Sequence, residues 1–500
     1  MIERALSGSY IAVRESAPLK ERQGFFTVDE IREGSRVVPM VEAHRHLEAS
    51  FGYSVIEMIS NKFGNLLQPQ TLAQIQNIME TPTGKSWLDF INSMPTRWGR
   101  LLEVAAGLRR TERKLVRKVA AFFQGINEKK VFKGIVGAGV EKMQAEHIGS
   151  LDLIVCPYAL TFEGNLTRVP NLDPVKITVS QEHTMLNGWD YKVSSGEIQA
   201  KNTLTIREYF RILHSVLSKR KSYDARFGIR REQLEGEFFK NRSLWDPAKK
   251  EELERQRQEG LLLIKELFDK GYIRGVDIAG DEGNVAHKLS NFSELHEELE
   301  ALGVPLSAHV GELGKKIVKR KKQFMSKVLH KKMSKKEQKA LRRLAFNNLQ
   351  TGIEWGLIMA HVPRLFDDSP EMNALLQVAL DKGLFYDFNI TSNLKLGIAR
   401  KASKHPVIRA YRREHSMFKK GDPEGDRRFE LLINHGTFNT DDPDIFGWYA
   451  DEPIISELAL ICKLTNNFGG RFRTVEEMLV HFNMVGQQRK AYMQHMYDQQ

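Results

Sequence analysis

Two histidines separated by a single residue, His44 and His46, follow an apolar stretch at residues 37–43. If that stretch is a buried strand, side chains two positions apart point to the same face, so both imidazoles would project together from its end. Two imidazoles held that close could bind one metal ion. The alternative is a polar strand end whose histidines face water.

Further histidines and acids stand at the ends of other apolar stretches. His309 lies in SAHVGEL and is followed by Glu312 three residues later, and His361 lies in MAHVP. Asp441 and Asp442 close NTDDP. Three imidazoles and a carboxylate form a set suited to zinc, with one position left for water. Each motif alone is a weak signal, and the four together predict one metal centre.

Eight stretches have the length and composition of β-strands, and helical patterns separate most of them. The predicted strands cover residues 37–43, 151–160, 225–232, 272–284, 304–312, 355–363, 384–393 and 429–443. Amphipathic helices are predicted at 101–126, 205–220, 251–271 and 293–303. This alternation indicates an α/β fold with a parallel sheet, and a count of eight favours a closed (β/α)8 TIM barrel. The carboxyl ends of its strands would open onto one face, where active sites lie.

The predicted division of the chain has two parts. Residues 1–36 form an N-terminal extension, and residues 37–500 form the barrel. The barrel would carry a helical insertion at about 52–150 and a basic helical insertion at about 315–350. No internal repeat is apparent.

The composition predicts a soluble protein with a large core. Hydrophobic residues make up 41% of the chain, but the longest apolar runs are far too short to cross a bilayer. The first thirty residues carry many charges and no apolar signal-peptide core. Only two cysteines are present, Cys156 and Cys462, so a disulfide framework is excluded and the cytoplasm is the expected compartment.

The formal net charge of +12 comes from one segment. Residues 315–343 contain fourteen Lys or Arg and a single acid, Glu337, which leaves the rest of the chain at −1. Apolar residues recur in this segment at helical spacing, and Ser334 to Glu337 has the pattern of a capping box that begins a second helix. The segment is either a solvated surface insertion or a cationic binding arm.

The motifs at the strand ends resemble those of the adenosine deaminase family of metal-dependent hydrolases. The resemblance spans nearly all of the chain after residue 36 and rests on motifs in the family's order, followed by a final segment similar to the family's closing helices. These motifs are HRHLEAS, GVDIAGDE, HVGE, the histidine of MAHVP, TSN at 391–393, and NTDDP.

The resemblance implies hydrolytic deamination of an adenine base by a metal-activated water. The residues that it implies as metal ligands, usually for zinc, are His44, His46, His309 and Asp441. Bound zinc lowers the pKa of water to about 7, and the resulting hydroxide attacks C6 of adenine. Glu312 matches the proton shuttle to N1, and His361 matches the residue that orients the water.

The resemblance also implies the contacts with substrate. Asp442 matches the residue that binds purine N7, and the backbone amide of Gly280 matches the one that reaches N3. Glu48 stands where nucleoside deaminases commonly place an aspartate that touches the ribose. The chain also departs from the family, because MAHVPRL lacks the glycine and second histidine usual after the catalytic histidine.

Each assignment has a structural alternative. Glu312 could pair with Lys315 or Lys316 on the surface, His361 could be a core histidine, and Asp442 could cap a helix. Gly280 could serve only as a turn residue. The remaining polar residues of these motifs are expected to support the site or the core; they are Asp277, Asp281, Glu282 and His435.

The basic insertion leaves the predicted barrel directly after Glu312, on the substrate face. Clustered Lys and Arg would attract a nucleotide or RNA and would do nothing for a bare nucleoside. The residues proposed for phosphate or nucleic-acid contacts are Lys315, Lys316, Lys319 and Arg320. A second hypothesis is a non-catalytic, deaminase-like barrel that acts as an assembly or nucleic-acid-binding subunit, and the sequence leaves oligomerisation open. A cytidine-deaminase zinc fold is excluded, because it requires two closely spaced cysteines.

Overall fold

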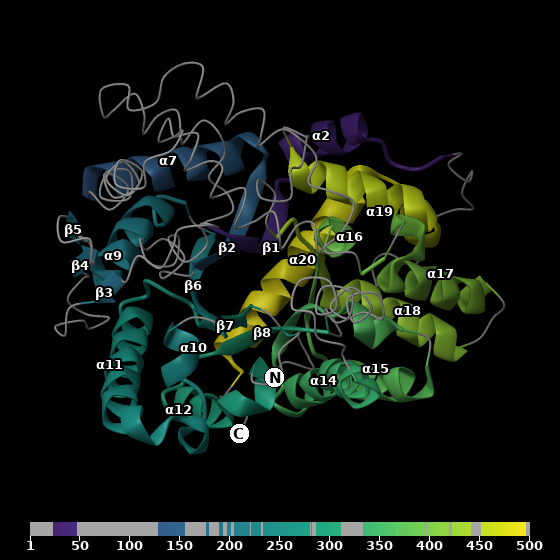
Figure 1. Cartoon of the computed structure of the whole chain (residues 1–500). Helices are drawn as coiled ribbons and strands as arrows, with labels where there is room; N and C mark the ends of the chain where they lie inside the picture. The colour runs from purple at the N-terminus through teal and green to yellow at the C-terminus, as the bar shows by residue number, and fades with distance from the viewer. Residues whose placement is uncertain are drawn as a thin grey trace, which may run out of the picture.

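Eight parallel strands form the centre of the molecule (Figure 1). In this computed structural model, they are hydrogen-bonded in the order β1-β2-β6-β7-β8-β9-β10-β11. The strands are β1 (Met40–His46), β2 (Ile148–Val155), β6 (Tyr223–Arg230), β7 (Val276–Ala279), β8 (Leu306–Val310), β9 (Ile358–His361), β10 (Tyr386–Phe388) and β11 (Gly436–Phe438). The residues that the structure describes are 24–47, 129–155, 177–179, 190–193, 198–201, 205–220, 222–231, 234–280, 282, 287–311, 334–367, 369–395, 398–399, 401–419, 423–441 and 452–496.

The first and last strands meet, so that the sheet is a nearly closed barrel. An isolated parallel bridge joins Arg45 to Asp441, at the carboxyl end of this seam. The amide nitrogen of Ala43 donates a hydrogen bond to Oδ1 of Asn439 at 2.6 Å. Side chains therefore supply part of the hydrogen bonding where β1 and β11 meet, and the predicted eight-stranded barrel is confirmed.

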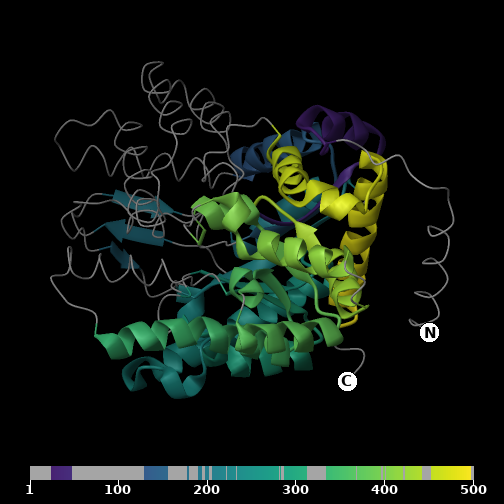
Figure 2. The ribbon, with the colours of Figure 1, turned by 90° about the vertical axis from the view of Figure 1, so that its right-hand side faces the viewer.

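Helices cover the outside of the barrel (Figures 1 and 2). The described helices are α2 (Val28–Val37), α7 (Lys129–Ala145), α9 (Ile206–Leu217), α10 (Leu234–Phe238), α11 (Lys250–Asp269), α12 (Ser293–Ala301), α14 (Lys335–Glu354), α15 (Pro370–Asp381), α16 (Ile390–Lys395), α17 (Pro406–Lys419), α18 (Pro423–His435), α19 (Pro453–Gly470) and α20 (Val475–Gln494). Short 3-10 helices are η2 (Arg242–Leu244), η3 (Pro247–Lys249), η5 (Leu289–Phe292), η6 (Pro363–Phe366) and η7 (Ala402–Lys404).

Local sequence explains where these helices begin and which face they bury. Helix α9 starts at a capping box, in which the amide nitrogen of Glu208 donates to Oγ1 of Thr205 at 3.1 Å. Its residues Ile206, Phe210 and Leu213 recur at helical spacing and are buried. The same periodicity predicted α9, α11 and α12, and all three are confirmed.

Two predicted strands are wrong over part of their length. Residues 390–393, in the stretch predicted as a strand at 384–393, belong to α16, and the predicted eighth strand is wrong over its first half. Residues 429–435, in the stretch predicted as the eighth strand, belong to α18, and the strand β11 begins only at Gly436. A short apolar run such as FELLINH fits a buried helix as well as a strand. His435, expected in the core of that strand, is the last residue of α18; its ring lies 5.0 Å from that of Phe385. Burial lowers the pKa of His435 to about 4.

The last residues of the predicted extension form α2 and dock on the C-terminal helices. The amide nitrogen of Phe26 donates to Oδ1 of Asn467 at 2.8 Å, and Nδ2 of Asn467 donates to the carbonyl of Gly24 at 3.1 Å. Asn467 adopts a left-handed φ of 52°, a conformation that asparagine tolerates better than most residues. The division into an extension and a barrel stays a prediction.

A small antiparallel sheet was not predicted. It consists of β3 (Ile177–Val179), β4 (Asp190–Val193) and β5 (Ile198–Lys201). The helix predicted at 101–126 and the first part of the basic insertion lie outside the described residues, whereas the helix predicted after Ser334 is α14. Within the described ranges, no helix has the length and apolar character needed to span a membrane. The cytoplasmic location stays a prediction.

Candidate metal and active site

Strand β1 carries both of its histidines into the barrel. His44 and His46 lie within the strand rather than after it, because β1 extends to His46 and not only to residue 43. Their side chains share one face, as the alternation of a strand requires, and both are buried. The amide nitrogen of His46 donates to the carbonyl of Asp441 at 3.0 Å, which places the middle of NTDDP beside this strand.

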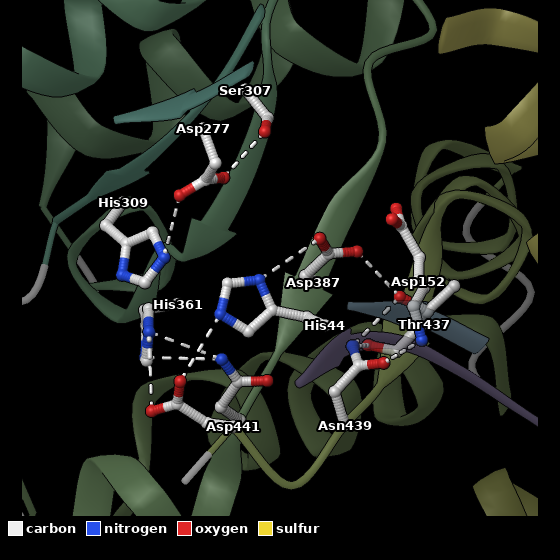
Figure 3. Close-up of polar contacts among 12 residues, drawn as sticks. His44, Asp152, Asp277, Ser307, His309, His361, Asp387, Thr437, Asn439 and Asp441 are labelled. Atoms are coloured by element: carbon white, nitrogen blue, oxygen red, sulfur yellow. Dashed lines mark hydrogen bonds and ion pairs between the residues drawn. The ribbon is translucent and has the colours of Figure 1, made fainter. Parts of the chain in front are cut away.

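Four imidazoles converge at the carboxyl ends of β1, β8 and β9. Figure 3 shows three of them, His44, His309 and His361. The ring centroid of His44 lies 4.7 Å from that of His309 and 5.4 Å from that of His361. The ring of His46 lies 5.2 Å from that of His309. Nitrogens of His44, His46 and His309 all lie within 4.8 Å of one another. The structure thus brings together histidines that are up to 317 residues apart in the chain.

Asp441 adds a carboxylate to this cluster. Its Oδ1 lies 3.3 Å from Nε2 of His44 and 3.5 Å from Nε2 of His46. Its Oδ2 accepts a hydrogen bond from Oγ of Ser392 at 2.7 Å and lies 3.7 Å from Nε2 of His361. Ser392 therefore fixes one oxygen of Asp441, while the other oxygen faces the two histidines of β1.

The ring of His361 is held by two asparagines. Its Nδ1 lies 3.2 Å from Oδ1 of Asn393, and its Nε2 lies 3.3 Å from Nδ2 of Asn389. Asn393 and Ser392 both belong to the TSN motif, which the sequence offered only as a family signature. The structure gives that motif a physical role, because it positions the side chains of His361 and Asp441.

The backbone is strained where two of these side chains leave their strands. The φ angles of His361, Val362 and Asp441 are 67°, 35° and 65°, in the left-handed region that residues with a Cβ rarely occupy. Such conformations cost of order 1–3 kcal/mol each and cluster at functional sites. Their presence at the ends of β9 and β11 supports a functional role for this face.

A carboxylate stands behind each of two histidines. Oδ1 of Asp277 lies 3.1 Å from Nε2 of His309, and Oδ2 of Asp387 lies 3.6 Å from Nδ1 of His44 (Figure 3). Histidines that bind a metal usually present their second nitrogen to such a partner, which fixes the orientation of the ring. Asp277, expected from the sequence to support the site or the core, thus lies beside His309.

Burial and neighbouring charges set the ionisation of the cluster. Burial lowers the pKa of His309 to about 3, so its imidazole is neutral, the form that binds metals. Burial also opposes protonation of His44, but Asp387 and Asp441 outweigh it and raise the pKa of His44. Burial would raise the pKa of Asp441, but the imidazoles of His361, His46 and His44 hold it well below its usual range.

The donor atoms fit a divalent cation. Both ring nitrogens of His44 and Oδ1 of Asp441 are buried and make no hydrogen bond of normal geometry among the described residues. The aspartates in and directly behind the cluster are Asp152, Asp277, Asp387 and Asp441, and the arginines paired with them are Arg226 and Arg489. When all the imidazoles are neutral, as metal binding requires, two positive charges against four negative ones leave these groups with a formal charge of −2, which one divalent ion would balance.

Two glycines shape the neighbouring strand ends. Gly280 directly follows β7 with a φ of 100°, and Gly311 directly follows β8 with a φ of 79°. A Cβ on Gly311 would lie 3.3 Å from Cα of Val362, so the glycine allows the ends of β8 and β9 to approach closely. The amide nitrogen of Gly311 donates to Oε1 of Glu282 at 3.0 Å, which supports the structural role expected for that acid.

Several predicted site residues lie outside the described ranges. They are Glu48, Asp281, Glu312, Lys315, Lys316, Lys319, Arg320 and Asp442. Glu312 directly follows the described Gly311, and Asp442 directly follows Asp441. Their roles stay predictions.

The residues that support the histidines from inside the barrel were not predicted from the sequence. Asp387 is the central residue of β10, and Arg489 lies on α20, 102 residues away in the chain. A buried aspartate within YDF is a weak signal of function. No sequence pattern linked it to Arg489.

Comparisons with known proteins give low similarity over long alignments. No protein-family model matches the chain, and no curated protein matches it in sequence. An adenine deaminase from Arthrobacter aurescens is 14% identical, with a TM-score of 0.43 over 90% of this chain and 99% of that one. The apo N6-methyl-AMP deaminase of Arabidopsis thaliana is 12% identical, with a TM-score of 0.45 over 94% of this chain and 98% of that one.

A third solved structure, an amidohydrolase from Burkholderia ambifaria with bound Zn, is 11% identical, with a TM-score of 0.44 over 97% of this chain and 98% of that one. Two of these neighbours are thus deaminases, and the third is an amidohydrolase. Because each TM-score lies below 0.5, the fold assignment rests on the strand order of this chain.

Proposed function

We propose that this protein is a metal-dependent hydrolase that deaminates the adenine base of a nucleoside or nucleotide. The observation that carries the proposal is a pair of overlapping donor groups at the carboxyl ends of the barrel strands, His44 with His46 and His309, and His44 with His361 and Asp441. The formal charge of −2 in and behind this cluster supports a divalent ion, for which zinc is the proposed identity.

The first step assigned to the chain is to hold the ion and the water. His44, His46, His309 and Asp441 would bind the metal, and His361, fixed by Asn389 and Asn393, would orient the attacking water. A bound zinc ion lowers the pKa of a coordinated water from 15.7 to about 7 and so supplies a nucleophile at neutral pH.

The next steps concern the base. Glu312 would protonate ring nitrogen N1 as C6 is attacked, and ammonia would leave after protonation. Asp442 would bind N7, and the amide nitrogen of Gly280, at the end of β7, would reach N3. Glu48 would contact the ribose. These roles are carried over from the family that the motifs resemble.

The substrate class follows from the basic insertion. The chain enters the insertion after Gly311, directly beyond the strand that carries His309. It returns through α14, whose exposed Lys336, Lys339 and Arg343 lie at helical spacing in the first half of the helix. A concentration of positive charge in the segment that directly follows this strand in the chain would favour a phosphorylated adenine or RNA over adenosine.

The test is a substrate panel read by the change in ultraviolet absorbance as adenine becomes hypoxanthine. Adenosine, AMP, N6-methyl-AMP, ATP and adenine-containing RNA are compared at low and high salt. The proposal expects deamination that requires metal and is faster for phosphorylated substrates at low salt. Metal-loaded protein that releases no ammonia from any of them would contradict the proposal and favour the non-catalytic barrel.

A further inference from the structure

The C-terminal helix α20 lies across the amino-terminal end of the barrel, opposite the candidate site (Figure 1). Nδ2 of Asn483 donates to the carbonyl of Pro39, just before β1, at 2.8 Å. Nζ of Lys490 donates to the carbonyl of Ser222, just before β6, at 2.8 Å. The hydroxyl of Tyr492 donates to the carbonyl of Gly356, just before β9, at 2.6 Å. The helix thus closes the end of the barrel where the strands begin.

One side chain of α20 reaches from the amino-terminal end of the barrel into its interior. Arg489 is fully buried, and its Nε and Nη2 donate to the two oxygens of Asp387 at 2.7 and 2.6 Å. Its Nη1 donates to Oδ2 of Asp152 at 3.0 Å. A guanidinium group can make this planar, two-pronged contact with one carboxylate and hold a second at the same time.

The contacts of Arg489 continue to the histidines of the candidate site. Asp387 lies 3.6 Å from Nδ1 of His44, as described above. Oδ2 of Asp152 also lies 3.0 Å from Nε of Arg226 on β6. Arg489 is therefore connected to His44 through Asp387. It is also connected to Arg226, through Asp152.

The contacts of Arg226 lead on to His309. Nη1 of Arg226 lies 3.1 Å from Oδ2 of Asp277 and donates to Oγ of Ser307 at 2.6 Å. Oγ of Ser307 donates to the same oxygen of Asp277 at 2.6 Å. The other oxygen of Asp277 faces His309 at 3.1 Å (Figure 3). Oδ2 of Asp277 thus contacts Arg226 and Ser307, and Oδ1 faces His309. These contacts fix the orientation of the carboxylate toward the imidazole.

We propose that Arg489, at the amino-terminal end of the barrel, is a positioning residue for the metal centre. It orients His44 through Asp387, and it orients His309 through Asp152, Arg226 and Asp277. This inference rests on the proposed metal site, not on the identity of the substrate. Without the guanidinium, Asp387 would remain buried with its charge uncompensated, and it would rotate or take up a proton. In either case His44 would lose the carboxylate that faces it.

The experiment compares metal affinity in the full-length chain. Arg489→Lys and Arg489→Met are titrated with Zn²⁺ by competition with a chromogenic chelator, and the free energy of unfolding is measured separately on metal-free protein. Loss of a partner that orients a metal-binding histidine weakens metal binding by 10–100-fold in general, and that range is expected for Arg489→Met. Arg489→Lys keeps the charge but cannot bind both oxygens of Asp387 and Asp152 together, so a smaller loss is expected.

Lys490→Met is the matched control. Lys490 is the next residue of α20 and pairs with Asp224 at 3.0 Å, but it does not contact the carboxylates behind the histidines. The control should lose stability without losing Zn²⁺ affinity. If either Arg489 variant does not fold, Asp387→Asn tests the same connection to His44 with a side chain of equal size.

Three outcomes overturn the inference. Arg489 or Asp387 variants with the Zn²⁺ affinity of the parent and reduced stability would show a structural role only. Equal losses of affinity in Arg489→Met and Lys490→Met would show a general effect of α20. A parent chain that binds no Zn²⁺ would remove the basis of both proposals, whereas a chain that binds Zn²⁺ and deaminates nothing would contradict the proposed function alone.

Discussion

The two ends of the barrel use their side chains for different purposes. At the carboxyl end, buried donor atoms of His44, His309 and Asp441 face one another, and the backbone of Asp441 is strained. At the amino-terminal end, α20 is held by ordinary hydrogen bonds to backbone carbonyls, such as that of Asn483 to Pro39. Three of the seven described non-glycine residues with a left-handed φ, His361, Val362 and Asp441, lie at the carboxyl end, where the proposed chemistry would take place.

The largest difference between the two ends should appear when a proposed metal ligand is removed. Asp441→Asn takes away a charge that faces His44 and His46, so deamination should fall by more than about a thousandfold, equivalent to roughly 4 kcal/mol of barrier. The measurements are kcat/KM and metal content. His495→Gln, an exposed histidine just beyond α20, is the control and should change neither. Full metal content with near-normal turnover in Asp441→Asn would refute its role as a ligand.

Within the carboxyl end, a variant of Glu312 separates proton transfer from metal binding. Because it is proposed to move a proton and not to bind the metal, Glu312→Gln should lose about a hundredfold or more in kcat while keeping its metal. Metal analysis and steady-state kinetics on the same preparation check this. Loss of metal together with activity would instead make Glu312 a structural or metal-binding residue.

The amino-terminal end should show its own dependence on pH. His481 on α20 is largely buried, and burial lowers its pKa to about 4, against about 6.5 in an unfolded chain. Between these values the unfolded state binds a proton that the folded state does not, so stability falls as pH decreases from 6.5 towards 4. Between pH 7 and 5, the free energy of unfolding of His481→Gln should therefore fall by roughly 1–2 kcal/mol less than that of the parent chain. Urea unfolding of metal-free protein measures it, and an unchanged pH slope would contradict the prediction.

The smallest effect is expected at the basic insertion. Replacing Lys315, Lys316, Lys319 and Arg320 with glutamine should lower kcat/KM for ATP by about tenfold at low salt, because the attraction of phosphate is lost. Turnover of adenosine should not change. Equal turnover of both substrates by the parent chain, independent of salt, would remove the proposed role of the insertion.

The sequence predicted the barrel and the candidate ligands because both depend on local patterns in a fixed order. Apolar runs that end in His309, His361 or Asp441 are visible in the chain, and parallel strands must bring their ends to one face. The contact between Arg489 and Asp387, which supports His44, was not predictable, because it forms only when α20 docks across the amino-terminal end of the barrel. The helix at residues 429–435 was misjudged since its apolar residues fit either period.

The most direct test of the metal centre is to strip the purified chain with a chelator and titrate it with Zn²⁺ while following bound metal and ammonia release from ATP, AMP and adenosine. We predict that one ion binds per chain, that deamination returns in proportion to bound ion, and that His309→Ala neither binds nor recovers. A stripped chain that deaminates as fast as before, or one that takes up no ion, would contradict the account.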